Sequence, residues 1–68
     1  MNDEPKTPAD ILDTALRKEK SAYNFYDRMA MQTRVAMVRE LLEKLREEEA
    51  KHVRMIEKKI AQLFLGKG

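Results

Sequence analysis

The sequence predicts an all-α protein: an antiparallel two-helix hairpin that pairs with a second copy of itself into a four-helix bundle. The chain has 68 residues, of which 43% are hydrophobic and 38% charged. This balance is typical of amphipathic helices in a single small domain. Both prolines lie in the first eight residues and both glycines in the last three, so few breaks interrupt a helix. Two apolar runs at helical spacing fill most of the remainder.

The need for a second copy follows from the size of the chain. A chain this short buries too little apolar surface to be stable without further support. It has no cysteine, which excludes disulfides and thiolate metal sites within these residues. The remaining sources of stability are self-association and a metal held by carboxylate and imidazole groups.

The first helix is predicted over residues 8–31, after a flexible segment at residues 1–7. Thr7 is a candidate N-cap, Pro8 suits the first helical position, and Asp10 lies where a capping-box acid would be. Steps of three and four then define one face, which consists of Leu12, Ala15, Glu19, Ala22, Tyr26 and Met29.

The second helix is predicted over residues 35–64, roughly 45 Å long at 1.5 Å per residue, so that the whole hairpin covers residues 8–66. Its face consists of Val35, Val38, Leu42, Leu45, Glu49, His52, Ile56 and Leu63. The segment Gly66-Lys67-Gly68 ends it.

The turn between the helices contains neither Gly nor Pro over residues 31–34, so one continuous helix over 8–65 is a local alternative. After Met29, however, steps of three and four would bring Thr33 and Ala36 to the apolar face, whereas the second run has another phase. Such a break in phase favours a hairpin. Thr33 is a candidate N-cap for the second helix.

Three ionisable residues lie on the apolar faces: Glu19 on the first, and Glu49 and His52 on the second. An unpaired charge in a helical core costs several kcal/mol, so these groups are expected to be neutralised, paired or bound to metal. A twofold dimer would bring in each group twice, giving the four carboxylates and two imidazoles of a dinuclear site in a four-helix bundle. Such ligands suit iron, manganese or zinc.

The neighbours of these residues leave alternatives open. A Glu three residues before the sole His is a weak signal by itself, and only its position on the apolar face gives it weight. Glu48 would replace Glu49 as a ligand if the helix register were shifted by one. Tyr26 could hydrogen-bond a ligand carboxylate from the same face as Glu19, or it could be a core aromatic. Asp27 and the faces rich in Lys and Arg are expected to be ordinary surface.

Two segments resemble ferritin-like and rubrerythrin-like proteins. Residues 19–26 (EKSAYNFY) are similar to the E-x-x-A-x-x-F-Y segment of those proteins, and residues 45–52 (LREEEAKH) to their L-x-x-E-E-x-x-H segment. The resemblance covers about residues 12–60. Members usually carry two hairpins in one chain, so it implies a homodimer that forms a ferritin-like four-helix bundle. The bundle would hold two iron ions per dimer, with the ligands Glu19, Glu49 and His52.

Two departures from the family pattern favour iron oxidation over the peroxidase action of rubrerythrins. Ala22 lies one turn after Glu19, where rubrerythrins can carry an extra Glu, and a rubredoxin-type Cys domain is absent. The resemblance therefore implies a ferroxidase-type oxidoreductase that uses dioxygen or peroxide. The residues alone leave two other functions open: a structural helical-bundle or coiled-coil module without redox activity, or a redox-silent zinc or manganese site.

Charge and hydropathy argue against other partners. The net charge is +2, but acidic and basic residues are interleaved, so no nucleic-acid partner is expected. No apolar run approaches the roughly 18 residues that span a membrane, and no signal peptide is visible. The expected location is the cytoplasm, or a protein compartment within it.

Overall fold

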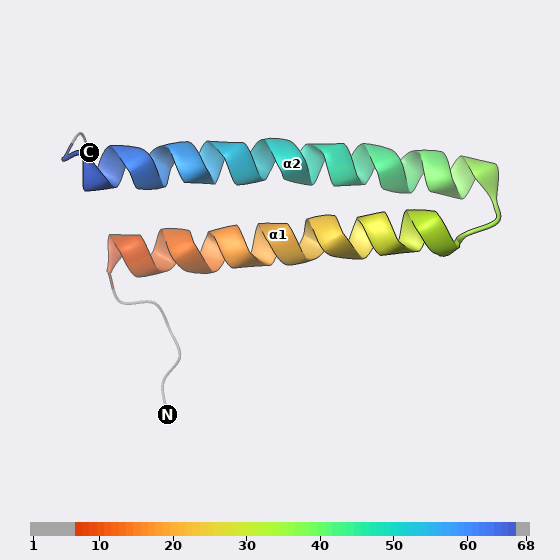
Figure 1. The fold of residues 1–68 in the computed structure, drawn as a ribbon, viewed down its shortest axis with the longest axis horizontal. Coiled ribbons are helices and arrows are strands. Elements are labelled where there is room, and N and C mark those ends of the chain that lie inside the picture. Colours follow the sequence, from red (N-terminus) through yellow and green to blue (C-terminus); the bar gives the residue numbers. More distant parts are fainter. Residues whose placement is uncertain (1–6, 67–68) are drawn as a thin grey trace, which may run out of the picture.

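Two antiparallel helices form the fold: α1 (Pro8–Gln32) and α2 (Ala36–Phe64). The computed structural model describes residues 7–66, so the predictions for residues 1–6 and 67–68 lie outside the described residues. Within the described range there is no strand. Figure 1 shows the helices side by side, joined by a short connection at residues 33–35. The predicted all-α hairpin is confirmed, and a continuous helix is excluded.

The start of α1 follows the predicted capping pattern. The Thr7 hydroxyl accepts a hydrogen bond from the Asp10 N–H at 3.1 Å, and the Thr7 carbonyl accepts one from the Ile11 N–H at 2.9 Å. Pro8 occupies the first turn, where its missing N–H removes no helical hydrogen bond. These contacts fix where α1 begins.

Thr33 ends α1 rather than beginning α2. Its N–H donates to the Met29 carbonyl at 3.0 Å, and its hydroxyl accepts from the Val35 N–H at 3.2 Å. Val35 is the N-cap of α2 and makes no side-chain cap bond. The prediction of Thr33 as the N-cap of the second helix is therefore wrong. The N-cap is Val35, two residues later, and the Thr33 hydroxyl accepts a hydrogen bond from the N–H of Val35 within the connection.

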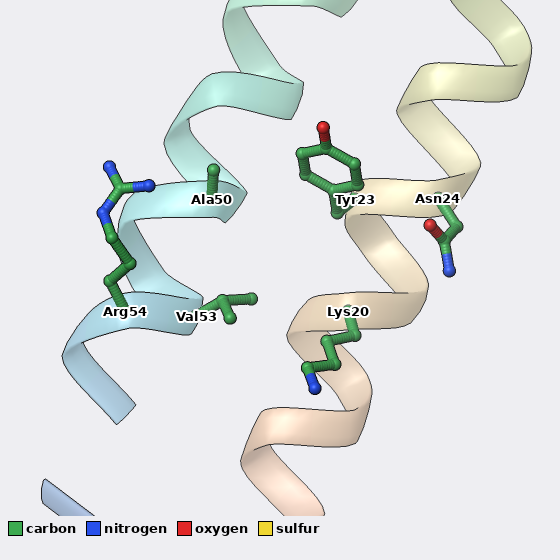
Figure 2. A pocket seen from close by; sticks show the side chains of 6 residues that line it. All are labelled: Lys20, Tyr23, Asn24, Ala50, Val53 and Arg54. Atoms are coloured by element: carbon green, nitrogen blue, oxygen red, sulfur yellow. The ribbon is translucent and has the colours of Figure 1, made fainter. Parts of the chain in front are cut away.

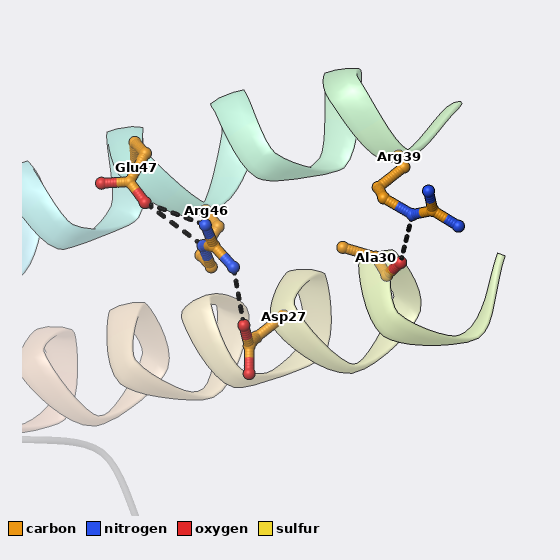
Figure 3. Close-up of polar contacts among 5 residues, drawn as sticks. All are labelled: Asp27, Ala30, Arg39, Arg46 and Glu47. Atoms are coloured by element: carbon orange, nitrogen blue, oxygen red, sulfur yellow. Dashed lines mark hydrogen bonds and ion pairs between the residues drawn. The ribbon is translucent and has the colours of Figure 1, made fainter. Parts of the chain in front are cut away.

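Arg39 of α2 reaches back across the connection to the end of α1. Its Nε donates to the Ala30 carbonyl at 3.3 Å, and its Nη2 donates to the Thr33 carbonyl at 2.7 Å; Figure 3 shows the contact with Ala30. Carbonyls at the C-terminal end of a helix lack partners within that helix. The Arg39 guanidinium supplies such partners and holds the first turn of α2 against α1.

The end of α2 is closed by backbone hydrogen bonds. The Leu65 N–H donates to the Ala61 carbonyl at 3.0 Å, and the Gly66 N–H donates to the Leu63 carbonyl at 3.1 Å. Gly66 has φ +73°, a left-handed conformation that glycine adopts at low cost. Gly66 therefore terminates the helix as predicted.

The hairpin has very little core of its own. Ala30, 3% exposed, is the one buried residue between residues 7 and 66. The predicted face of α1 is only half-buried, and on α2 Val35 and Val38 are 54% and 40% exposed. Each helix therefore has an apolar face that the other covers incompletely, and such a face needs another element to pack against. In the described part of the chain, neither helix is long and apolar enough to cross a membrane.

Candidate metal centre

The antiparallel arrangement brings the three polar residues of the apolar faces together. Glu19 lies in the middle of α1, while Glu49 and His52 lie on one face of α2, three residues apart. His52 Nδ1 is 2.7 Å from Glu19 Oε1 and 3.2 Å from Glu49 Oε1. One potential ligand atom from each residue lies within 4.8 Å of the other two. Neither helix could build this cluster alone.

The two carboxylates favour one protonation state of the imidazole. An ionised carboxylate oxygen only accepts, so with both glutamates ionised Nδ1 of His52 carries a hydrogen that the two carboxylates share. The bond to Glu19 is the main cause that raises the pKa of His52 above its ordinary value; the bond to Glu49 adds to it, and desolvation opposes it. A positive charge is therefore already favoured at the centre of the cluster.

The cluster is partly exposed to solvent, on the side of the hairpin that we call the open face. The side chains of Glu19, Glu49 and His52 are 28%, 16% and 44% exposed. Two carboxylate oxygens and one imidazole nitrogen fit the preferences of ferrous iron, manganese and zinc. Three ligands leave coordination positions for further groups, and the exposure leaves access for them. The donor set therefore fits a metal ion and leaves coordination positions open to further ligands.

Two other residues considered from the sequence stand apart from the cluster. The Tyr26 ring packs edge-on against Phe25, with 5.6 Å between the ring centroids, and among residues 7–66 its hydroxyl makes no hydrogen bond to a ligand carboxylate. Glu48 has a side chain 58% exposed that pairs with Lys51 at 3.4 Å. Glu49, not Glu48, thus lies opposite α1, and a tuning role for Tyr26 stays a prediction.

Asp27, expected to be ordinary surface, makes an ion pair with the other helix. Its Oδ1 lies 2.8 Å from Arg46 Nη1, and the two side chains are only 39% and 25% exposed; Figure 3 shows this contact together with the one from Arg46 to Glu47. A weaker pair joins Lys20 to Glu57 at 4.0 Å. Both pairs join α1 to α2. The sequence could reveal them only if the residues of the two helices were aligned with each other from the connection outward.

An open groove of about 300 Å³ lies between the helices beside the cluster. Figure 2 shows Tyr23 and Val53 pointing into the space between α1 and α2. The residues that line the groove are Lys20, Tyr23, Asn24, Ala50, Val53 and Arg54. None of them belongs to the carboxylate–imidazole cluster, so groove and cluster are separate features.

A helical hairpin with a carboxylate–imidazole cluster on its open face belongs to the class of all-α proteins with a candidate metal site between helices. Comparison with protein families makes the assignment more specific, because the family model described as rubrerythrin matches residues 10–68. The chain therefore belongs to the rubrerythrin family, and the resemblance seen in its two segments is confirmed. No curated protein and no solved structure gives a significant match.

Proposed function

We propose that two hairpins pair through their half-covered faces, and that the shared site binds two ferrous ions and oxidises them with dioxygen or hydrogen peroxide. The observation that carries this proposal is the meeting of Glu19, Glu49 and His52, at 2.7 and 3.2 Å, on the open face. The rubrerythrin family typically binds iron, which supports the choice of metal.

A second copy would complete both the packing and the ligand set. Val38 and Leu41 are 40% and 56% exposed, and the apolar faces of both helices are only half-buried, so there is apolar surface for a partner to cover. A twofold axis would double the cluster to four carboxylates and two imidazoles, the set that holds two metal ions in four-helix bundles. Four carboxylates also balance the charge of two ferrous ions.

The residues of one hairpin would divide the work between the helices. Glu49 and His52 share a face of α2, so both can reach one ion, and Glu19 reaches it from α1. His52 must release its Nδ1 proton before that nitrogen can bind a metal. Bound there, two ferrous ions together supply two electrons, the number that reduces dioxygen to hydrogen peroxide or hydrogen peroxide to water.

An anaerobic titration of the metal-free protein with ferrous chloride tests the proposal. The expected end-point is about one ferrous ion per chain, hence two per dimer. Admission of dioxygen should then produce ferric absorbance and consume oxygen in proportion to the bound iron.

Two variants and a matched control assign the binding to the cluster. Glu49→Ala and His52→Ala should abolish stoichiometric binding, whereas Glu48→Ala, which removes an exposed neighbouring carboxylate, should leave it unchanged. Full affinity in both cluster variants would contradict the proposal and favour a structural helical module. Stoichiometric metal binding without oxygen consumption would favour a redox-silent zinc or manganese site.

A further inference from the structure

We propose that two ion pairs between α1 and α2 set the register of the hairpin and thereby place the candidate ligands opposite one another. The pairs are Asp27–Arg46 and Lys20–Glu57. Their members act as positioning residues. The effect on metal binding rests on the proposed function, whereas the register itself is a property of the metal-free chain.

The apolar contacts of the hairpin do not select one register. Ala30 is the one buried residue in the described range, and hydrophobic contact is not directional. A slip of one helical turn, three or four residues, would keep each apolar face turned toward the other helix. Arg39 binds the Ala30 and Thr33 carbonyls, which are free because they end α1, so it fastens the connection but does not contact the residues of the cluster.

On α2 the two ion pairs flank Glu49 and His52, and the pairs have opposite polarity. Toward the connection, the carboxylate of Asp27 on α1 meets the cation of Arg46 on α2 at 2.8 Å. In the pair Lys20–Glu57, at 4.0 Å, the cation directly follows Glu19 on α1 and the carboxylate lies on α2 beyond His52. A pattern that changes sign along the seam can be satisfied in fewer registers than a uniform one.

Asp27 meets no cation in any register one turn away. A slip of three or four residues in either direction replaces Arg46, its present partner, with another residue of α2. The replacements would be Leu42, Glu43, Glu49 and Ala50. Arg46 would also lose its partner on α1, because none of its new neighbours there is acidic. These would be Tyr23, Asn24, Ala30 and Met31.

Lys20 likewise meets no carboxylate in those registers. Its replacements for Glu57 would be Val53, Arg54, Ile60 and Ala61. Glu57 itself would meet a cation, Arg17, in one slip of three residues. That same slip places Lys20 opposite Arg54, and it also brings Asp27 opposite a carboxylate. The native register is therefore the one in which both pairs are satisfied.

Register selection is compatible with the modest strength of exposed ion pairs. Such pairs contribute little to the stability of a fold, but a register requires only that the alternatives be worse. In the slip of three residues just described, Glu19 would lie opposite Arg46 and Glu49 instead of Glu49 and His52. The imidazole would then leave the cluster, and the metal would lose a ligand.

A charge swap on the full-length chain tests the inference. Asp27→Arg places like charges opposite each other, and Asp27→Arg with Arg46→Asp restores the attraction with the polarity reversed. Affinity for Co²⁺, followed by its visible absorption, reports the cluster. In the metal-free protein, the nuclear Overhauser contacts of the Tyr23 ring to side chains of α2 report the register, because this ring points into the interhelical space (Figure 2).

We expect Asp27→Arg to weaken Co²⁺ binding about tenfold or more, as loss of a supporting contact does at metal sites. The Overhauser contacts of the Tyr23 ring to α2 should change with it, since a slip of one turn moves the helices about 5.4 Å along each other. The double variant should recover both. The matched control is Asp13→Arg, with the same change of charge at an exposed residue that pairs within α1, to Arg17 at 3.1 Å; it should change neither.

Wild-type Co²⁺ affinity in the Asp27→Arg variant would overturn the inference, and so would a double variant no better than the single one. An equal loss in Asp13→Arg would overturn it as well, because the effect would then be one of net charge. If the single variant fails to fold, the Co²⁺ affinity of the double variant decides: wild-type affinity supports the inference, and weak binding overturns it. Failure of the wild-type chain to bind Co²⁺ would reject the metal site alone, and the Overhauser contacts of the Tyr23 ring in the metal-free protein would still test the register.

Discussion

His52 is the one histidine of the chain, and its Nδ1–H is shared between the carboxylates of Glu19 and Glu49. These contacts raise the pKa of His52 in the folded state. Their stabilising contribution to the metal-free hairpin is therefore fully present at pH values below the ordinary histidine pKa of about 6.5. That contribution is lost as the pH rises through the raised pKa. Metal affinity, by contrast, rises as the pH rises, since the metal needs an unprotonated nitrogen.

The pKa of His52 in the metal-free protein can be measured directly by NMR, because no other imidazole interferes. We expect a value above the ordinary one, and a fall toward it in Glu19→Gln, since the bond to Glu19 is the main cause of the shift. Glu48→Gln, at an exposed site outside the cluster, should leave the value unchanged. A wild-type pKa at or below the ordinary value would contradict the hydrogen-bonded cluster.

The cluster could be predicted from the sequence because its signal lies within single helices. Glu19, Glu49 and His52 each break an apolar face, and the structure brings all three together. The pair Asp27–Arg46 could not be predicted in this way, since each residue resembles an ordinary surface charge on its own helix. What connects them is the register between two helices, which the periodicity of one helix does not contain.

At the level of elements, the connection depends on Arg39. Replacing it with Ala removes donors from the Ala30 and Thr33 carbonyls, and we expect the free energy of unfolding to fall by about 1 kcal/mol. Urea denaturation followed by circular dichroism measures this change. The control is Arg34→Ala in the connection itself, where the side chain makes no hydrogen bond within residues 7–66. Equal losses in both variants would assign the effect to charge rather than to the contacts.

The sequence predicts the helices better than their junction. The break in phase after Met29 locates a turn that contains neither Gly nor Pro, and the hairpin confirms it. The sequence pattern attributes Thr33 to the wrong helix, because a threonine hydroxyl suits several roles near helix ends. The exposure of Val35 and Val38 could not be read from periodicity either, since α1 ends before it could cover them.

At the level of the whole molecule, the proposed pairing of hairpins makes a distinct prediction. Val38→Glu would place an unpaired carboxylate in the dimer interface, far from the cluster, and should weaken dimerisation about 100-fold or more. Sedimentation equilibrium measures the constant. Ala61→Glu makes a matched change at an exposed position of α2 outside the predicted apolar face and should leave the dimer intact. A wild-type chain that is monomeric at all concentrations would refute the shared site.

The start of α1 and the end of α2 lie at the same end of the hairpin (Figure 1). This places a geometric condition on any tandem duplication of the unit. Two copies whose open ends adjoin could be fused through a short linker. Copies that point in opposite directions would need a linker along the 29 residues of α2, about 43 Å, which takes at least about 13 extended residues. The shortest linker that preserves assembly would therefore reveal the relative orientation of the two copies.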